Sequence, residues 1–143
     1  MVYEGLSEYA IKKILDHVMG KTSFTMPATV YVALYNGNPL VAGTELADPP
    51  ATGYARVATS GKWAAAAFVS PTGTIVSNAD LDFGVAGSAW GTVDYMAIFD
   101  DDGSPSGNML ACGPLEVSRS VQLNDPVKFP AGELKVRLTQ ATV

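Results

Sequence analysis

The sequence has very little of the side-chain chemistry that enzymes and metal proteins depend on. Its 143 residues include one histidine, His17, and one cysteine, Cys112. A single cysteine excludes an internal disulfide and any metal site built from several cysteines. Cys112 lies in the apolar run MLACG, which favours a buried thiol over a reactive one. His17 has no second histidine with which to share a metal, so we interpret it as a packing or helix-surface residue.

Motifs for catalysis and cofactor binding are also missing. No G-x-S-x-G segment, the usual setting of a nucleophilic serine, occurs in the sequence. Gly84, Gly87 and Gly91 do not have the spacing of a phosphate-binding or dinucleotide-binding loop. The 14 acidic residues allow many carboxylate pairs, but none stands out as a pair for glycoside hydrolysis. We therefore expect no enzymatic activity, no catalytic residues, no cofactor and no metal.

Charge is scarce and mostly negative. Charged residues make up 16% of the chain, against about 25% in an ordinary soluble domain. The net charge of −5 and the scattered lysines and arginines argue against nucleic-acid binding, which depends on clustered basic residues. A surface so poor in charge suggests that partners cover part of it. The alternative is that abundant alanine and threonine simply lower the charged fraction.

Long hydrophobic runs are absent as well. The longest apolar stretch covers residues 63–69, far short of the roughly 20 residues that span a bilayer. The N-terminal segment has acidic residues where a secretory signal would have lysines, and no cleavage pattern follows. We expect a protein made in a cytoplasm, with no membrane partner.

One amphipathic helix is predicted over residues 6–20. Ser7 is a good N-cap, Glu8 suits the first turn, and Gly20 is a natural stop. Apolar residues recur at spacings of three and four, so they form a stripe along one side. The stripe consists of Ile11, Ile14, Leu15, Val18 and Met19. Because a short helix gains most of its stability by docking such a stripe, it must pack on its own domain or on a neighbour.

The rest of the chain predicts short strands. β-Branched and aromatic runs alternate with turn residues at intervals near ten residues, without helical periodicity. The expected strands are 29–35, 54–60, 63–69, 74–78, 79–83, 92–99, 108–115, 118–123, 126–129 and 133–139, of which 63–69 is ambiguous. Residues 36–53 are expected to form a long ordered loop. In the last strand, Leu134, Val136 and Leu138 share one face.

These patterns predict a mainly β fold in one domain covering residues 1–143. The N-terminal helix is followed by an antiparallel β-sandwich or barrel of about eight short strands over residues 29–139. Residues 92–99 and 108–115 are expected to pair as a hairpin around a polar turn at 100–107.

The acidic turn allows two interpretations. Asp100, Asp101 and Asp102 precede Gly103, and clustered carboxylates beside a glycine suit calcium. The spacing does not fit a helix–loop–helix calcium site, because residue 111, where a glutamate is needed, is alanine. The favoured interpretation is a soluble hairpin tip that resists edge pairing, and cation binding stays open.

Five segments, taken in order, resemble a family of small virion proteins from tailed bacteriophages. They are GLSEYA…LDHVMG (5–20), FTMPATVYVALY (24–35), GTEL…GYAR (43–56), WGTVDYMAIFD (90–100) and GNMLACGPL (107–115). Members of this family are commonly labelled tail fibre proteins, and related β-rich proteins are capsid decoration or cement subunits. The resemblance covers nearly the whole chain. It implies a structural protein of the virion that binds other protein subunits.

The resemblance leaves two placements. One is a decoration protein on the capsid exterior that binds the major capsid protein, copies of itself (as a dimer or trimer), or both, and stabilises the head. The other is a tail fibre or tail-tip protein with a role in host recognition. The chain is short for a fibre shaft and has no repeats, heptads or collagen-like tracts, so capsid decoration is the favoured expectation.

Three groups of residues are the candidate contacts with partner subunits. Large apolar, aromatic and arginine side chains dominate protein interfaces, which guides the choice. The candidates are the stripe residues Ile11, Ile14, Leu15 and Val18, then Tyr54 and Arg56 with the 36–53 loop, and Trp63. For each of them the alternative is ordinary packing in the core.

Overall fold

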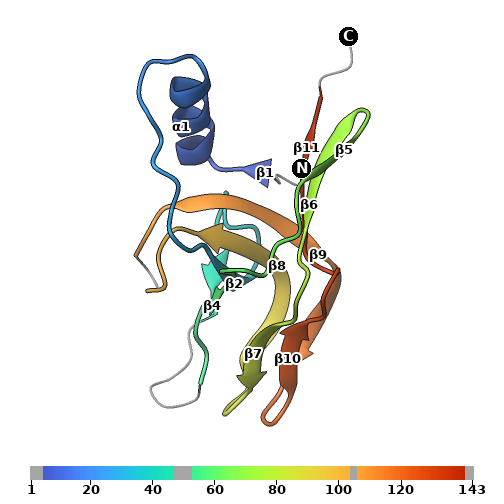
Figure 1. Ribbon diagram of the computed structural model, residues 1–143. Coiled ribbons are helices and arrows are strands. Elements are labelled where there is room, and N and C mark those ends of the chain that lie inside the picture. The colour runs from blue at the N-terminus through green and yellow to red at the C-terminus, as the bar shows by residue number, and fades with distance from the viewer. Residues whose placement is uncertain (1–4, 47–52, 104–105, 141–143) are drawn as a thin grey trace.

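A computed structural model describes residues 5–46, 53–103 and 106–140, and the expected mainly β fold is confirmed. One helix, α1 (Glu8–Val18), accompanies antiparallel sheets that stack in a sandwich-like way, without closing into a barrel in the described parts (Figure 1). The strands are β1 (Gly5–Leu6), β2 (Tyr31–Asn36), β3 (Thr44–Glu45), β4 (Val57–Ala58), β5 (Ala67–Val69), β6 (Thr72–Val76), β7 (Leu81–Val85), β8 (Gly91–Phe99), β9 (Met109–Val121), β10 (Pro126–Phe129) and β11 (Lys135–Thr139).

The largest sheet has the strand order β1-β9-β8-β2-β3, with β4 beside β2. Its centre is β8, which pairs with both β2 and β9, as its long run of β-forming residues predicts. Four consecutive residues, 96–99, are buried, because both faces of this strand are covered. The expected hairpin of β8 and β9 around the polar turn is confirmed.

β9 is a single strand, and the prediction of two strands at 108–115 and 118–123 is wrong. Val93 pairs with Arg119 and Tyr95 pairs with Pro114, so residues 115–118 all lie opposite Asp94. The extra residues form an irregular bulge at which the strand bends instead of reversing. The segment Leu115–Ser118 has none of the glycine, asparagine or aspartate chemistry that a reversal requires.

The core lies between one face of the large sheet and the two-stranded sheet of β7 and β10. Alternate residues of β2 and β8 supply its centre, including Val32, Leu34, Met96 and Ile98. A second, smaller cluster on the opposite face contains Ala33, Ala97, Phe99 and Cys112. The expectation that Cys112 is buried is therefore confirmed.

A three-stranded sheet in the order β11-β6-β5 stands away from the rest of the molecule, and we call it the arm (Figure 1). The register pairs β11 with β6 from Lys135↔Val76 to Thr139↔Thr72. α1 projects in the same direction on the other side of the molecule. The arm and α1 are thus two separate projections from one β body.

Several shorter segments differ from their expected boundaries. The helix begins at Glu8 and ends at Val18, two residues inside each expected end. In segment 54–60 only β4 is a strand, and in 63–69 only β5 is, with Trp63 forming an isolated bridge to Ser77. The expected 36–53 loop contains the short strand β3, and its residues 47–52 lie outside the described parts. Tyr54 lies outside any strand, and its ring packs against the core.

Candidate subunit interface

α1 is attached to the body by its first turn. The hydroxyl of Ser7 accepts a hydrogen bond from the Ala10 amide (3.1 Å) and donates one to the Met109 carbonyl. The Ser7 amide also donates to the Leu110 carbonyl at 2.9 Å. Ala10 is the one buried residue of the helix. The predicted N-cap is confirmed, and it fixes the helix against β9 through very little side-chain packing.

The apolar stripe of α1 is open to solvent. Its four candidate contact residues, Ile11, Ile14, Leu15 and Val18, range from 36% exposed at Ile14 to 71% at Val18. Met19, just past the helix, is also exposed. Among the residues that the structure describes, none covers most of this stripe. Because isolated helices of this length are marginal in water, an uncovered stripe is a candidate contact with another molecule.

The segment after the helix supports the opposite end of α1. The Phe24 amide donates a 3.0 Å hydrogen bond to Nδ1 of His17, and the Phe24 ring meets the edge of Tyr9. His17 is exposed on the helix surface, which is one of the two roles that its isolation in the sequence suggested. These contacts hold the helix in place without covering the apolar stripe.

The arm carries a second exposed apolar surface. Phe68 of β5 and Leu138 of β11 both lie opposite Gly73 of β6, so the three residues share one face of the sheet. Val136 and Ile75 pair with each other and continue the same face. We call Phe68, Ile75, Val136 and Leu138 the arm face. Phe68 and Leu138 are exposed at its outer end.

The alternating apolar residues of the last strand differ in how deeply they are buried. Leu134 is 4% exposed, Val136 is half-buried against the core, and Leu138 is 56% exposed. The three residues point the same way, but burial falls because the strand runs out beyond its own core. The sequence pattern indicated the shared face but gave no sign that its outer half is exposed.

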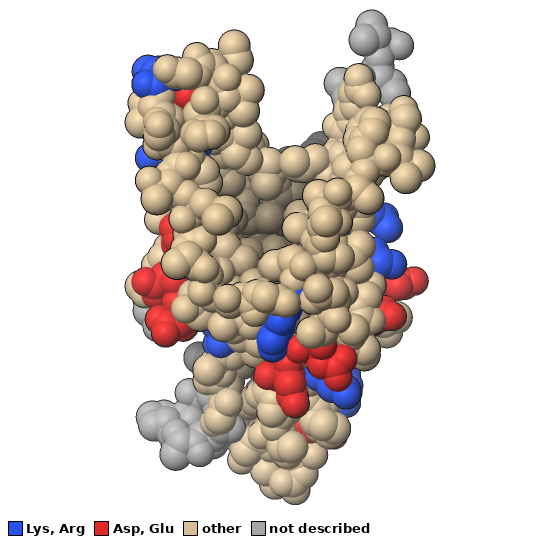
Figure 2. All heavy atoms as spheres, viewed as in Figure 1, with Lys and Arg blue, Asp and Glu red and all other residues tan. Residues whose placement is uncertain are grey.

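A hollow separates the two projections. In Figure 2 the surface between α1 and the arm is recessed, and the part visible in that view is uncharged. At the base of the arm, a groove of about 670 Å³ is lined by β1, β2, β8, β9, β10 and β11, with charged as well as apolar side chains. Its apolar lining includes Leu6, Leu115, Val127 and Val136. The two exposed apolar surfaces thus lie on either side of a recess.

Tyr54 lies in the core instead of on a contact surface. Its ring stacks on Phe83 and meets the Trp90 ring edge-on, with centroids 6.2 and 5.4 Å away. Its hydroxyl accepts from the Leu34 amide at 3.0 Å and donates to the carboxylate of Glu45 at 3.2 Å. Burial raises the pKa of Tyr54 well above its ordinary value.

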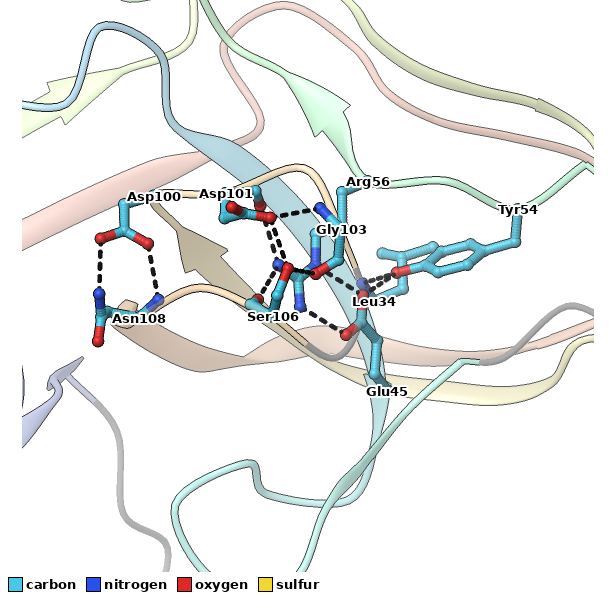
Figure 3. A network of polar contacts seen from close by, with 9 residues as sticks. All are labelled: Leu34, Glu45, Tyr54, Arg56, Asp100, Asp101, Gly103, Ser106 and Asn108. Atoms are coloured by element: carbon cyan, nitrogen blue, oxygen red, sulfur yellow. Dashed lines mark hydrogen bonds and ion pairs between the residues drawn. The ribbon is translucent and has the colours of Figure 1, made fainter.

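Arg56 is also internal, where it joins the acidic turn to β3. Its guanidinium forms a two-point ion pair with Glu45, Nη2–Oε2 at 2.8 Å and Nε–Oε1 at 2.9 Å (Figure 3). Nη1 donates to the carbonyls of Asp101 and Ser106, both at 2.9 Å. The guanidinium lies 3.8 Å from the centroid of the Phe99 ring. These hydrogen-bond donors are engaged within the chain, so Arg56 is poorly placed to bind a partner subunit.

The electrostatics of this network follow from its burial. The side chains of Arg56 and Glu45 are 1% and 9% exposed. Burial acts to lower the pKa of Arg56, but the hydrogen bonds and charge of Glu45 outweigh it, so this pKa is raised. Burial, reinforced by the charge of Glu45, raises the pKa of Tyr35 to about 12. The charged pair is thus a structural link between β3, β4 and the acidic turn.

Trp63 has a packing role as well. Its indole Nε1 donates a 2.9 Å hydrogen bond to the hydroxyl of Thr59, which is itself buried. Its ring packs against the main core. Of the candidate contact residues, those of the α1 stripe are exposed, whereas Tyr54, Arg56 and Trp63 are engaged inside the domain. In the sequence, an aromatic or arginine side chain beside a turn has the same pattern whether it lies in an interface or in the core.

The carboxylates of the acidic turn organise the turn itself. Asp101 accepts hydrogen bonds from the Gly103 amide (2.8 Å) and the Ser106 hydroxyl (2.7 Å). Asp100 accepts from the amide and the side chain of Asn108. The hydrogen bond from Ser106, followed by that from Gly103, holds the pKa of Asp101 below its ordinary value. Within the described residues, no group of three metal-ligating side chains comes together.

The described helix is too short to cross a membrane, so no candidate membrane span exists in that part of the chain. The geometry as a whole is that of a small antiparallel β protein with two exposed apolar projections and an internal ion-pair network. The fold belongs to the class of small antiparallel β proteins, and exposed apolar surfaces of this kind often mark contacts with other proteins.

A comparison with known protein families identifies the family of this chain. The family described as Podophage GP4 fiber I protein gp80 matches residues 5–137, and the chain belongs to this family. It is therefore a structural virion protein of a bacteriophage fibre family, as the sequence resemblance implied. No curated protein matches the chain significantly.

Proposed function

We propose that this chain is a subunit of a bacteriophage fibre and works by binding other protein subunits through α1. The family description supports the fibre over the capsid placement that the length of the chain suggested. The observation that carries the proposed contact is the apolar stripe of α1, which the described parts of the chain leave exposed. Burying Leu15 and Val18 in an interface contributes about 1–2 kcal/mol each.

The contact is tested by separating binding from folding. Leu15→Glu places a charge in the stripe, whereas Lys12→Glu changes a charge on the same helix outside the stripe. Leu15→Glu is expected to leave the thermal midpoint of the chain almost unchanged, because the side chain is exposed. It should sharply reduce incorporation into virions in a complementation assay, and Lys12→Glu should not. Normal incorporation of Leu15→Glu would eliminate α1 as the contact.

A second candidate function is capsid decoration. It is favoured by a chain of 143 residues without repeats, which is short for an elongated shaft. In this role the partner is the major capsid protein, and many copies stabilise the shell. Particles lacking the chain should then lose resistance to heat and osmotic shock. Particles of unchanged resistance would remove this candidate.

A further inference from the structure

The groove at the base of the arm opens onto the core of the sandwich. Its volume of about 670 Å³ lies within the range of about 300–1,000 Å³ that is typical of binding pockets. Its buried lining includes Leu34, Val93 and Met96, which belong to the main core. Val117 of β9 also lines the groove and is 75% exposed. An apolar side chain that entered the groove would therefore meet apolar neighbours.

One wall of the groove is the edge of β11. Residues 133–137 all line the groove, one after another. A strand presents alternate residues on each of its faces, so a consecutive run indicates that the backbone itself borders the groove. Among the described strands β11 pairs only with β6, so its other edge has no partner strand there.

The alternation of hydrogen bonds identifies the backbone groups on this free edge. The amide of Leu134 donates to the hydroxyl of Ser77 at 3.3 Å, and its carbonyl accepts from the Ser77 amide at 2.9 Å. Ser77 follows β6, so Leu134 directs its backbone groups toward that strand. Successive residues of an antiparallel strand direct these groups to opposite sides. Lys135 and Arg137 therefore direct their amides and carbonyls away from β6, where a second extended chain matches their spacing.

The groove also concentrates the positive charge of an acidic protein. Its described lining includes four basic residues, Arg119, Lys128, Lys135 and Arg137, and two acidic ones, Glu116 and Glu133. The rest of the chain has the other five of the nine basic residues and the other twelve of the 14 acidic ones. Lys128 pairs with Asp80, whereas the other three cations form no ion pair within the described residues. The rim of the groove thus favours an acidic partner.

A strand added to the free edge of β11 would have two different faces. On one face its side chains continue the face of Leu134 and Val136, which pack against the core. On the other face its side chains lie beside Lys135 and Arg137, which are exposed. Carboxylates at these positions form cross-strand pairs of opposite charge. The surroundings therefore suit a segment in which apolar residues alternate with aspartate or glutamate.

We propose that the groove binds an extended segment of another protein as an added strand on the free edge of β11, with apolar and acidic residues alternating along the segment. In strand addition the main-chain hydrogen bonds supply affinity, and the alternate side chains supply specificity. The site is separate from α1, so it is a second contact beyond the one in the proposed function. An acidic polysaccharide would meet the cations of the rim but would not match the strand edge.

Binding of a synthetic peptide to the full-length chain tests the site. The probe is a short fluorescent peptide that alternates valine with glutamate, and the control peptide has lysine at every glutamate position. Fluorescence anisotropy should show that the glutamate peptide binds several-fold more tightly than the lysine peptide. In the double variant Lys135→Glu, Arg137→Glu this preference should reverse. Because both side chains are exposed, the thermal midpoint should stay nearly unchanged.

Two substitutions at Arg137 separate the strand edge from the charge. Arg137→Ala removes the charge and keeps the backbone amide, whereas Arg137→Pro removes both. The amide points away from β6, so proline at this position keeps the ladder with β6. Arg137→Pro should therefore bind the glutamate peptide several-fold more weakly than Arg137→Ala does. If Arg137→Pro does not fold, the reversal of preference in the double variant still decides the proposal.

Each alternative result overturns the proposal in a defined way. Equal binding of the two peptides, or binding of neither, means that the groove does not accept such a strand. Equal binding by folded Arg137→Pro and Arg137→Ala means that the peptide does not pair with β11. Binding of an acidic polysaccharide alone means that the ligand is not a polypeptide. Peptide binding that appears only after deletion of residues 1–4, which lie outside the described parts, means that the chain itself fills the groove.

The α1 contact provides the last control. Leu15→Glu lies outside the groove and should bind the glutamate peptide as the native chain does. Loss of peptide binding in this variant would contradict two separate contacts. Because Leu15→Glu tests incorporation into virions and the groove variants test peptide binding, this inference and the proposed function can fail separately.

Discussion

The ion pair between Arg56 and Glu45 makes the sharpest prediction about stability. The perturbation is Glu45→Gln, which keeps the shape of the side chain and removes its charge. In the native protein Glu45 meets the guanidinium at two points, and both side chains are almost fully buried. Arg56 would retain the carbonyls of Asp101 and Ser106 and lose its only carboxylate partner among the described ion pairs.

The expected cost follows from this burial. Removing one partner of a buried pair destabilises a protein by about 3–5 kcal/mol, because the other charge stays in a poorly solvated site. We take about 3 kcal/mol, since two carbonyls still accept from Arg56. For a chain of 143 residues each kcal/mol shifts the thermal midpoint by about 4 °C, so a fall of about 12 °C is expected.

Thermal unfolding followed by circular dichroism is the assay, with urea unfolding to obtain the free energy. The control is Lys128→Gln, which breaks a second ion pair, Lys128–Asp80 at 3.0 Å. Both of its side chains are about half exposed, so the loss should stay below about 1 kcal/mol. A Glu45→Gln variant as stable as Lys128→Gln would refute the view that Arg56 is a buried structural charge.

Three further predictions concern the turns and the titratable groups. Gly43→Ala should destabilise the chain by about 1–3 kcal/mol in urea unfolding, because a Cβ at this position would lie 2.3 Å from the Gly37 carbonyl oxygen. The control is Gly113→Ala, whose Cβ would meet nothing within 4 Å, so its free energy of unfolding should be unchanged. The raised pKa of Tyr35 means that its contribution to stability is complete below pH 10 and is lost as the pH rises through about 12. In Tyr35→Phe the free energy of unfolding should therefore fall less steeply over this pH range. An unchanged profile would contradict the assignment. The lowered pKa of Asp101 has the opposite sign, so its contribution is complete above pH 3.8 and is lost as the pH falls through the lower native value. The difference in thermal midpoint between the native chain and Asp101→Asn should therefore shrink in acid, and a constant difference would argue against it.

Much of the fold could be predicted because local patterns and tertiary packing agree. The run TVDYMAIF has the composition of a central strand, and β8 is central. The Ser7 cap and the spacing of the apolar residues predict α1 to within two residues at each end. The polar residues after Phe99 predict the hairpin turn. In each case the signal is contained in a few neighbouring residues.

The errors arise where distant segments decide the outcome. Residues 115–118 of β9 lie opposite a single residue of β8, so the strand continues through a bulge where two strands were expected. The local sequence does not reveal this pairing. Arg56 is buried because β3 and the acidic turn surround it with acceptors. The exposed end of the arm depends on where the core stops, so Leu134 and Leu138 have equivalent positions in the pattern and opposite burial.

Direct localisation of the chain on virions tests the central proposal, that it is a fibre subunit. An antibody fragment or a small fused tag at the exposed turn around Leu123 would mark the chain in electron micrographs. The proposal predicts label on the fibres, in a small number of copies on each particle. Label distributed over the capsid shell, with none on the fibres, would contradict it and support capsid decoration.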